Sequence, residues 1–242
     1  MKISFCITTA GTAVDTLNKS IETIIQECEQ KCEYEILVIG GKQNDISFDG
    51  VRHIEFLDDP TKGFLPKRKN FLAKEAIYDN IVMMHDYLAL QIGWLDGFIK
   101  FNIENPDWLA CVNRIQNING KEFRSWCAVF QDAYRTPIDN QKPPLHLGLG
   151  RKINPRIKTW GRWQYYSGAY FIVRKRIMLD SPMDETLERH QGEDITTSRQ
   201  WYQKYGSKIF AWNPYSTIKF LKPKDHAGWE SLPEINYDMG LV

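Results

Sequence analysis

The sequence predicts an α/β fold with a mostly parallel central sheet flanked by helices. In the first half of the 242 residues, short apolar segments of strand length alternate with segments of helical periodicity, which is typical of βαβ units. Polar or glycine-containing clusters directly follow the strand-like segments. The second half is less regular, but Tyr165–Lys208 reads as a strand, a turn, a polar loop and an amphipathic helix.

The first expected strand is Ile3–Thr8, an apolar run that ends in Thr8-Thr9-Ala10-Gly11. A helix is expected from about Thr16 to Glu29. Its apolar residues recur on one face, namely Leu17, Ile21, Ile24 and Ile25.

Further elements follow in the same alternation. A basic segment, Lys62–Lys69, leads into a helix that ends near Ala76, and Trp94–Phe101 is expected to form another helix. The remaining expected strands are Glu35–Ile39, Val51–Leu57, Asn80–Met84, Trp108–Arg114 and Phe123–Gln131. The proline-rich segment from Thr136 to Gly161 carries several basic residues and is interpreted as a lid or as a surface excursion.

Composition narrows the function classes. Hydrophobic content of 43% and charged content of 25% are ordinary for a globular protein, and a net charge of +1 does not indicate a nucleic-acid partner. The five cysteines (Cys6, Cys28, Cys32, Cys111 and Cys127) show no zinc-type spacing, and no segment approaches the ~20 apolar residues of a membrane span. We therefore expect a cytoplasmic protein with reduced cysteines, whose cationic Lys142–Lys158 segment leaves peripheral membrane contact open.

The polar clusters predict one ligand crevice. Parallel sheets bind ligands beyond the carboxyl ends of their strands, where these clusters lie. The segments expected to line the crevice are Thr8–Gly11, Gly40–Lys42, Asp58-Asp59 and His85–Tyr87.

The acidic residues of the second half are the main candidates for chemistry. Glu193-Asp194 opens a helix after the small-residue turn Ser167-Gly168-Ala169 and a further acidic pair, Asp184-Glu185. Acidic residues at a helix start are common caps, so a capping role and a catalytic role both remain open.

The order of these pieces resembles the acceptor half of the inverting glycosyltransferases of family 2. The run from Lys67 to Trp94 is similar to the family stretch that ends in an Asp-x-Asp motif followed by Gly-Trp. The resemblance implies a GT-A fold: a Rossmann-like, mostly parallel sheet with a small mixed sheet on the acceptor side. It also implies one catalytic domain over residues 1–242, with 1–95 binding the nucleotide-sugar and 96–242 binding the acceptor.

The resemblance further implies an activity and its residues. A sugar would pass with inversion from a nucleotide-sugar, expected to be UDP-linked, to a glycan, polysaccharide or lipid-linked glycan acceptor, assisted by Mn²⁺ or Mg²⁺. Asp194 would be the general base and Glu193 would orient the acceptor. The implied nucleotide-sugar-binding residues are Thr8, Thr9, Ala10, Gly11, Gly41, Lys69, Asn70, His85, Asp86 and Tyr87; those for the acceptor are Trp163, Gly168, Asp184 and Glu185; and those for the metal are Asp86 and His226.

The chain departs from the family pattern at three places. His85 and Tyr87 stand where the two acids of Asp-x-Asp are expected, with Asp86 between them. Lys69-Asn70 replaces an Arg-Asn pair that touches the nucleotide in the family. Gly40-Gly41-Lys42 replaces acids that bond to the base and ribose, for which Asp45 and Asp58 are the candidate substitutes.

Two other functions are compatible with the same sheet and crevice. A sugar-nucleotide nucleotidyltransferase usually carries a basic, glycine-rich loop after its first strand, whereas Thr9–Val14 has no basic residue. A non-catalytic glycan- or nucleotide-binding module would hold glycan on the aromatic residues near the end of the chain. Of these aromatic residues we expect Trp201 and Trp212 in the core, and Trp160 and Trp163 at the site.

Overall fold

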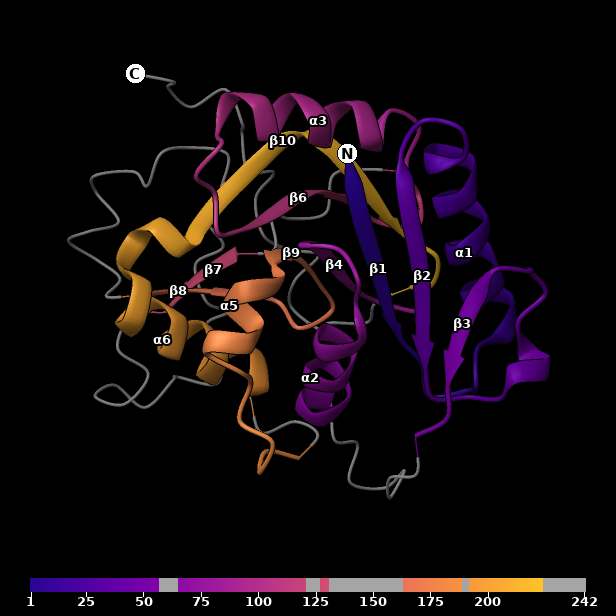
Figure 1. Ribbon diagram of the computed structural model, residues 1–242, viewed down its shortest axis with the longest axis horizontal. Coiled ribbons are helices and arrows are strands. Elements are labelled where there is room, and N and C mark those ends of the chain that lie inside the picture. The colour runs from indigo at the N-terminus through magenta and orange to yellow at the C-terminus, as the bar shows by residue number, and fades with distance from the viewer. Residues whose placement is uncertain (57–64, 121–126, 131–162, 189–191, 224–242) are drawn as a thin grey trace.

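The structure is a computed structural model that describes residues 1–56, 65–120, 127–130, 163–188 and 192–223 (Figure 1). Four parallel strands form the amino-terminal part of its central sheet. They are β1 (Lys2–Thr8), β2 (Glu33–Ile39), β3 (Val51–Ile54) and β4 (Asn80–His85), in the order β3-β2-β1-β4. Because their pairings are parallel, the carboxyl ends of these strands lie at one edge of the sheet.

The sheet continues beyond β4 with strands from later in the chain. β9 (Tyr170–Arg174) pairs antiparallel with both β4 and β6 (Ala110–Gln116). β10 (Phe210–Phe220) pairs parallel with β6, and β5 (Leu88–Leu90) pairs antiparallel with β10. The complete order is β3-β2-β1-β4-β9-β6-β10-β5, and β7 (Cys127–Phe130) with β8 (Trp163–Tyr166) forms a separate antiparallel pair.

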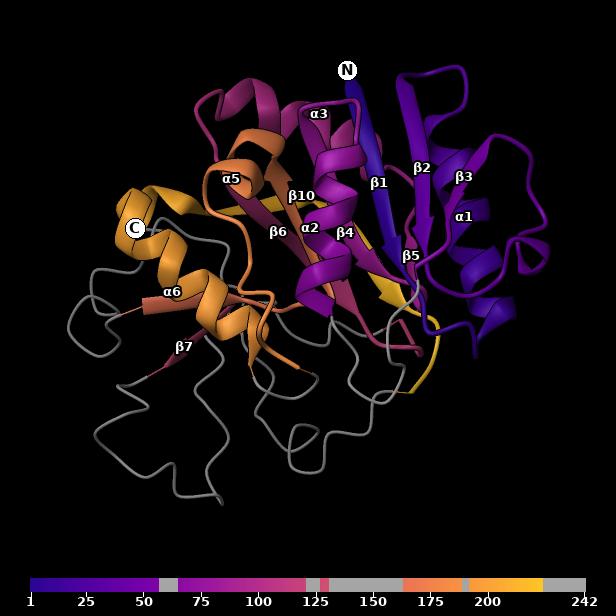
Figure 2. The ribbon, with the colours of Figure 1, turned by 60° about the horizontal axis from the view of Figure 1, so that its bottom comes forward.

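Helices cover both faces of the sheet. α1 (Val14–Cys28) and α3 (Trp94–Glu104) contact each other, and α3 also contacts β10. α2 (Leu65–Glu75) and α5 (Lys175–Asp180) contact each other on the opposite face, and α6 (Glu193–Tyr205) packs against β8 (Figure 2). Two short 3₁₀ segments, η1 (Gln43–Asp45) and η2 (Gly206–Ile209), follow β2 and α6.

One buried carboxylate joins the two helices on the first face. Glu27 of α1 is 6% exposed and accepts hydrogen bonds from the backbone N–H groups of Gly93 and Leu95, each at 3.1 Å. These amides belong to the start of α3, where the helix leaves donors unsatisfied. The contact fixes the start of α3 against α1.

An aromatic cluster anchors α6. The ring of Trp201 lies 5.8 Å from that of Phe171 and 6.5 Å from that of Tyr166, and its Nε1–H donates to the carbonyl of Ser181 at 2.8 Å. Trp201 is 1% exposed, which confirms the expectation that it belongs to the core. Its packing holds α6, and therefore the acidic residues at its start, against β8 and β9.

The predicted α/β class, with a Rossmann-like sheet flanked by helices, is confirmed. The strands of the second half join this central sheet, and the separate two-stranded sheet is antiparallel. Within the described residues, β10, β5 and α5 were not expected, and the single strand expected after Tyr165 is two strands, β8 and β9, separated by a turn. No helix of the described segments combines the length and apolar character needed to cross a bilayer.

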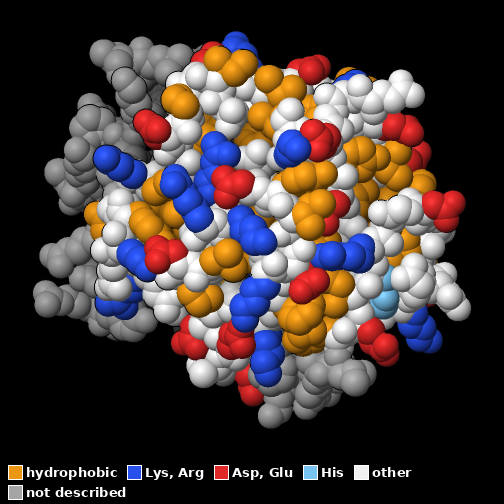
Figure 3. All heavy atoms as spheres, in the orientation of Figure 1, with side chains coloured by type: hydrophobic (Ala, Val, Ile, Leu, Met, Phe, Trp, Pro, Cys, Tyr) orange, Lys and Arg blue, Asp and Glu red, His pale blue; other side chains and the backbone are white. Residues whose placement is uncertain are grey.

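The surface over α2 and α5 is mixed in character. Lys and Arg side chains run across this face, interspersed with acidic and apolar ones (Figure 3). This face therefore presents no extended field of a single sign.

Candidate functional site

The loops after β1 and β2 meet through glycines. Gly11, Gly40 and Gly41 have φ values of +73°, +88° and +66°, a region that glycine adopts without strain. A Cβ on Gly40 would lie 2.4 Å from the carbonyl oxygen of Thr9, and one on Gly11 would lie 2.8 Å from the Cα of Gly41. The two loops therefore touch backbone to backbone, leaving peptide groups to line the space beside them.

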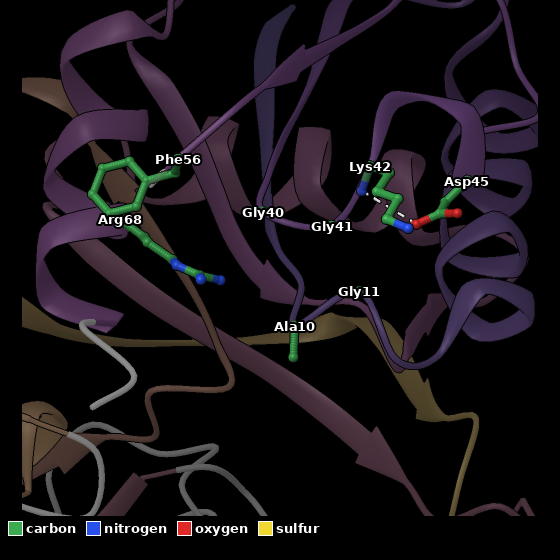
Figure 4. Close-up of a pocket in the computed structure, with 8 residues that line it drawn as sticks. All are labelled: Ala10, Gly11, Gly40, Gly41, Lys42, Asp45, Phe56 and Arg68. Carbon is green, nitrogen blue, oxygen red and sulfur yellow. Dashed lines mark hydrogen bonds between the residues drawn. The ribbon is translucent and has the colours of Figure 1, made fainter. Parts of the chain in front are cut away.

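That space is a cavity of about 360 Å³ (Figure 4). Phe56 and Arg68 lie on one side, and Lys42 and Asp45 lie on the other. The lining residues are Ala10, Gly11, Gly40, Gly41, Lys42, Asp45, Phe56 and Arg68. The cavity thus combines an aromatic ring, two cations, a carboxylate and backbone groups, which suits an aromatic ligand that carries negative charge.

Arg68 and Asp45 are held in place by the backbone around them. Nη1 of Arg68 donates to the carbonyl of Thr9 at 2.6 Å, and the guanidinium carbon lies 5.9 Å from the centre of the Phe56 ring. The carboxylate of Asp45 accepts a hydrogen bond from the backbone N–H of Lys42 at 3.2 Å. Both charges are therefore positioned by the same loops that line the cavity.

Asp86 fixes the loop after β1. Its carboxylate accepts a hydrogen bond from the hydroxyl of Thr9 at 2.6 Å, and that hydroxyl in turn accepts one from the N–H of Gly11 at 2.9 Å. Burial raises the pKa of Asp86, while the Thr9 hydrogen bond and the charge of Lys222 act in the opposite direction. As placed, this carboxylate positions the loop that lines the cavity.

The neighbours of Asp86 pack against one another. Nδ1 of His85 lies 2.9 Å from the hydroxyl of Tyr87, whose ring stacks on Phe220 at 6.1 Å. The ammonium of Lys222 lies 4.1 Å from the centre of the Tyr87 ring. Tyr87 is 9% exposed and is part of the core at this end of the sheet.

The residues that the structure describes do not assemble a metal site. Among them there is no group of three His, Cys, Asp or Glu side chains that could hold an ion. Asp86 is the one carboxylate of the His85-Asp86-Tyr87 triplet, and an oxygen of it is bonded to Thr9. The second predicted ligand, His226, and the predicted crevice residues Asp58-Asp59 lie outside the described residues.

Lys69 and Asn70 contact the segments around Gly168 and Met183, whereas the adjacent Arg68 lines the cavity. Nζ of Lys69 donates to the carbonyl of Gly168 at 2.8 Å and lies 3.8 Å from Oε1 of Glu193. Nδ2 of Asn70 donates to the carbonyl of Met183 and to Glu185, and its Oδ1 accepts from the N–H of Met183. Neither residue lines the cavity, so their predicted contact with the nucleotide stays a prediction.

The predicted base stands at the start of α6 and is bonded to another segment. Gly192 is the N-cap residue, and it makes no side-chain cap hydrogen bond. Asp194 accepts a hydrogen bond from the N–H of Gly168 at 3.0 Å. Besides its helix-end position, Asp194 therefore joins α6 to the turn between β8 and β9.

The second acidic pair braces its own loop. The carboxylate of Asp184 accepts hydrogen bonds from the N–H and the hydroxyl of Thr186, and these bonds lower the pKa of Asp184. Glu185 accepts the bond from Asn70 described above. Trp163, also predicted on the acceptor side, belongs to β8.

Sequence reasoning did not single out Phe56 or Arg68 as ligand-binding residues. Arg68 belongs to the basic segment Lys62–Lys69, in which nothing distinguishes it from its cationic neighbours. Phe56 carried no signal, because an aromatic residue at the end of a strand is usually core. Asp45, which was a candidate substitute for the missing acids, does line the cavity.

No model of a known protein family matches the chain, and neither does any curated protein. Among solved structures it is similar to GalNAc-T7 with UDP, GalNAc and Mn²⁺, with a TM-score of 0.63 and 14% identity, over 91% of this chain and 44% of that one. It is also similar to residues 1–349 of Staphylococcus aureus TarS in complex with UDP, with a TM-score of 0.57 and 15% identity, over 90% of this chain and 60% of that one. These neighbours are GT-A glycosyltransferases. The chain therefore has the GT-A fold, and it spans less than two thirds of either neighbour's length.

Proposed function

We propose that the protein is an inverting glycosyltransferase that moves a sugar from a UDP-linked donor to a hydroxyl of a glycan or lipid-linked glycan. The observation that carries this proposal is the hydrogen bond from Gly168 to Asp194. This bond holds the carboxylate at the start of α6 beside the Gly168 turn. Lys69 joins the same turn to α2, the helix that also carries Arg68. Transfer between two substrates requires that the base and the nucleotide cavity are held at a fixed position relative to each other, as these connected elements would do.

The cavity supports a nucleotide donor. Phe56 offers a face for a base, Asp45 offers a hydrogen-bond acceptor, and Arg68 with Lys42 offers positive charge for phosphate. The peptide groups of Gly11, Gly40 and Gly41 allow close approach of a ligand. The UDP in the two similar structures makes UDP the first nucleotide to test.

The proposed chemistry at Asp194 is general base catalysis. As the acceptor oxygen attacks the anomeric carbon, its proton passes to Asp194, and the bond from that carbon to the nucleoside diphosphate breaks on the opposite face. Glu193 orients the acceptor, and the loop that carries Asp184 and Glu185 supports the acceptor side together with Gly168 and Trp163. The start of α6 favours the ionised form of a carboxylate, as a base requires.

The proposed cofactor is Mn²⁺ or Mg²⁺, which both prefer oxygen ligands. Asp86 would supply one carboxylate, and His226 is the proposed second ligand. When bound, the cation would neutralise charge on the departing diphosphate. No step above depends on it, because the described residues alone do not complete a metal site.

The test is sugar transfer by wild type and by Asp194→Asn, assayed over UDP-sugars and glycan acceptors. Loss of a general base is expected to lower kcat by about 10²–10⁴-fold, while UDP affinity stays at the wild-type value. Asp96→Asn is the matched control, because Asp96 is an exposed acid in the first turn of α3 and its change also removes charge from a helix start.

Three outcomes are informative. Full turnover in Asp194→Asn would refute the assignment of the base. Equal losses in Asp194→Asn and Asp96→Asn would point to helix capping in place of catalysis. UDP binding by wild type without transfer to any acceptor would favour the non-catalytic binding module.

A further inference from the structure

Lys69 is a buried cation with an unusual set of neighbours. Its side chain is 1% exposed, although lysine is rarely buried unless it is paired. Its ammonium donates to the carbonyl of Gly168 at 2.8 Å and lies 5.9 Å from the centre of the Phe171 ring of β9. A charge in such a position is costly without an opposite charge close by.

The opposite charges come from the start of α6. Oε1 of Glu193 lies 3.8 Å from Nζ of Lys69, and the side chain of Glu193 is 13% exposed. Burial lowers the pKa of Lys69, and the charges of Glu193 and Asp194 raise it. These two carboxylates are the charged groups that act on the ammonium, and since attraction is mutual, the ammonium also attracts them.

Gly168 links Lys69 to Asp194 a second time. Its carbonyl accepts from Lys69, and its N–H donates to Asp194 at 3.0 Å. A Cβ at this position would lie 2.7 Å from Oε1 of Glu193 and 3.0 Å from Nζ of Lys69. The side chains of Lys69, Glu193 and Asp194 therefore surround Gly168, which has no side chain of its own. A shift of Lys69 would thus move the Gly168 peptide group that orients Asp194.

We propose that Lys69 is a positioning residue for the acid pair at the start of α6. It holds the Gly168 turn against Asp194, draws Glu193 toward itself, and sets one positive charge against two negative ones. Asp194 then stays oriented until it takes the acceptor proton. This role rests on the proposed function, and it differs from the nucleotide contact that the sequence predicted for Lys69.

The test compares Lys69→Met, which removes charge and donor, with Lys69→Gln, which keeps a donor for Gly168. Lys74→Met is the matched control, because Lys74 is exposed on the same helix. Each protein is assayed for kcat and KM across pH, for UDP affinity by calorimetry, and for titration of its carboxyl groups by NMR without substrate.

In Lys69→Met we expect kcat to fall about 10- to 100-fold, as for a misplaced catalytic group. The acidic limb of its pH–rate profile and the carboxyl titration of the acid pair should move to higher pH, because the positive charge beside the two carboxylates is gone. UDP affinity should not change. Lys69→Gln should recover part of kcat but keep the pH shift, and Lys74→Met should match wild type.

Weaker UDP binding with an unmoved pH profile would overturn the proposal and make Lys69 a nucleotide ligand. Carboxyl titrations that match wild type would also overturn it. If Lys69→Met does not fold, Lys69→Gln decides through the same pH shift. If wild type transfers no sugar, the proposed function fails while the NMR titration still decides whether Lys69 governs the acid pair.

Discussion

Replacing Gly168 with alanine should disturb the positions of Lys69 and Glu193 while leaving the fold almost as stable as in wild type. The new Cβ would lie 2.7 Å from Oε1 of Glu193, whereas ordinary contact begins at 3.4 Å. Glu193 must therefore retreat by about 0.7 Å, the difference between these two distances. Nζ of Lys69, at 3.0 Å, must also give way.

The expected effect is large on turnover and small on folding. Misplacement of a catalytic group by ~1 Å can cost about 10²-fold, so kcat should fall by about 10- to 100-fold. The clashing atoms are the ends of flexible side chains, which can move aside. Alanine also lowers the conformational entropy of the unfolded chain, which stabilises the folded state by ~0.4–1 kcal/mol. Tm should therefore change by less than about 4 °C.

The assay is steady-state transfer together with thermal unfolding and UDP calorimetry on the same preparation. Unchanged UDP affinity would show that the cavity is intact and that the loss arises at the acid pair. Wild-type turnover in Gly168→Ala would refute the reasoning, because Glu193 and Lys69 would then tolerate displacement. A large fall in Tm would show that Gly168 is needed for the fold as a whole.

Three further positions, Gly97, Asp86 and Asn70, give testable predictions. Gly97→Ala should lower Tm by about 4–8 °C, because its Cβ would meet the backbone oxygen of Tyr215 at 2.3 Å, which overpacks the α3–β10 contact by roughly 2 kcal/mol; a wild-type Tm would contradict this. Burial raises the pKa of Asp86 in the folded state, so the protein loses stability as the pH rises from the ordinary carboxyl pKa through this raised value. Asp86→Asn removes this loss and should therefore not lower Tm at pH 7. In wild type, EDTA should reduce the Tm shift that UDP causes with Mn²⁺, and Asp86→Asn should lose this metal increment; an increment that survives in the variant would exclude Asp86 as a ligand. Asn70→Ala should lower kcat without weakening UDP binding, because Asn70 holds the loop at Met183 and not the cavity.

The parallel half of the fold could be predicted from the sequence because its signals are local. The buried run Ile3–Thr8 corresponds to β1, and the apolar face of the first predicted helix is the buried face of α1. Polar clusters at strand ends correctly indicated that Thr9, Gly11 and Gly41 would meet. Such features depend on residues close together in the chain, which periodicity detects well.

β10 could not be predicted in the same way. Its sequence, FAWNPYSTIKF, contains Pro214 and several polar residues, which argue against a strand. The structure accommodates them with a register shift between Asn213 and Thr217, where pairing with β6 is interrupted. Pairing with a distant strand decides this element, and the local pattern carries no sign of it.

In the site, too, contacts between distant parts of the chain could not be predicted from the local sequence. Successive helical residues point about 100° apart, so Arg68, Lys69 and Asn70 reach three different partners although they are adjacent in the sequence. The resemblance assigned the nucleotide contact to Lys69-Asn70, whereas Arg68 lines the cavity. Lys69 meets Gly168, which is 99 positions away, and neither composition nor spacing could have shown that contact.

The most direct test of the central claim is the thermal shift of wild type with UDP and Mn²⁺, with Arg68→Ala beside it. A ligand at 100 times its Kd stabilises the folded state by about 2.7 kcal/mol, which corresponds to a rise in Tm of roughly 5–10 °C for a chain of this size. The account predicts such a rise in wild type and a much smaller one in Arg68→Ala. No shift with UDP or any other nucleoside diphosphate would contradict it, because the cavity between Phe56 and Asp45 would then not be a donor site.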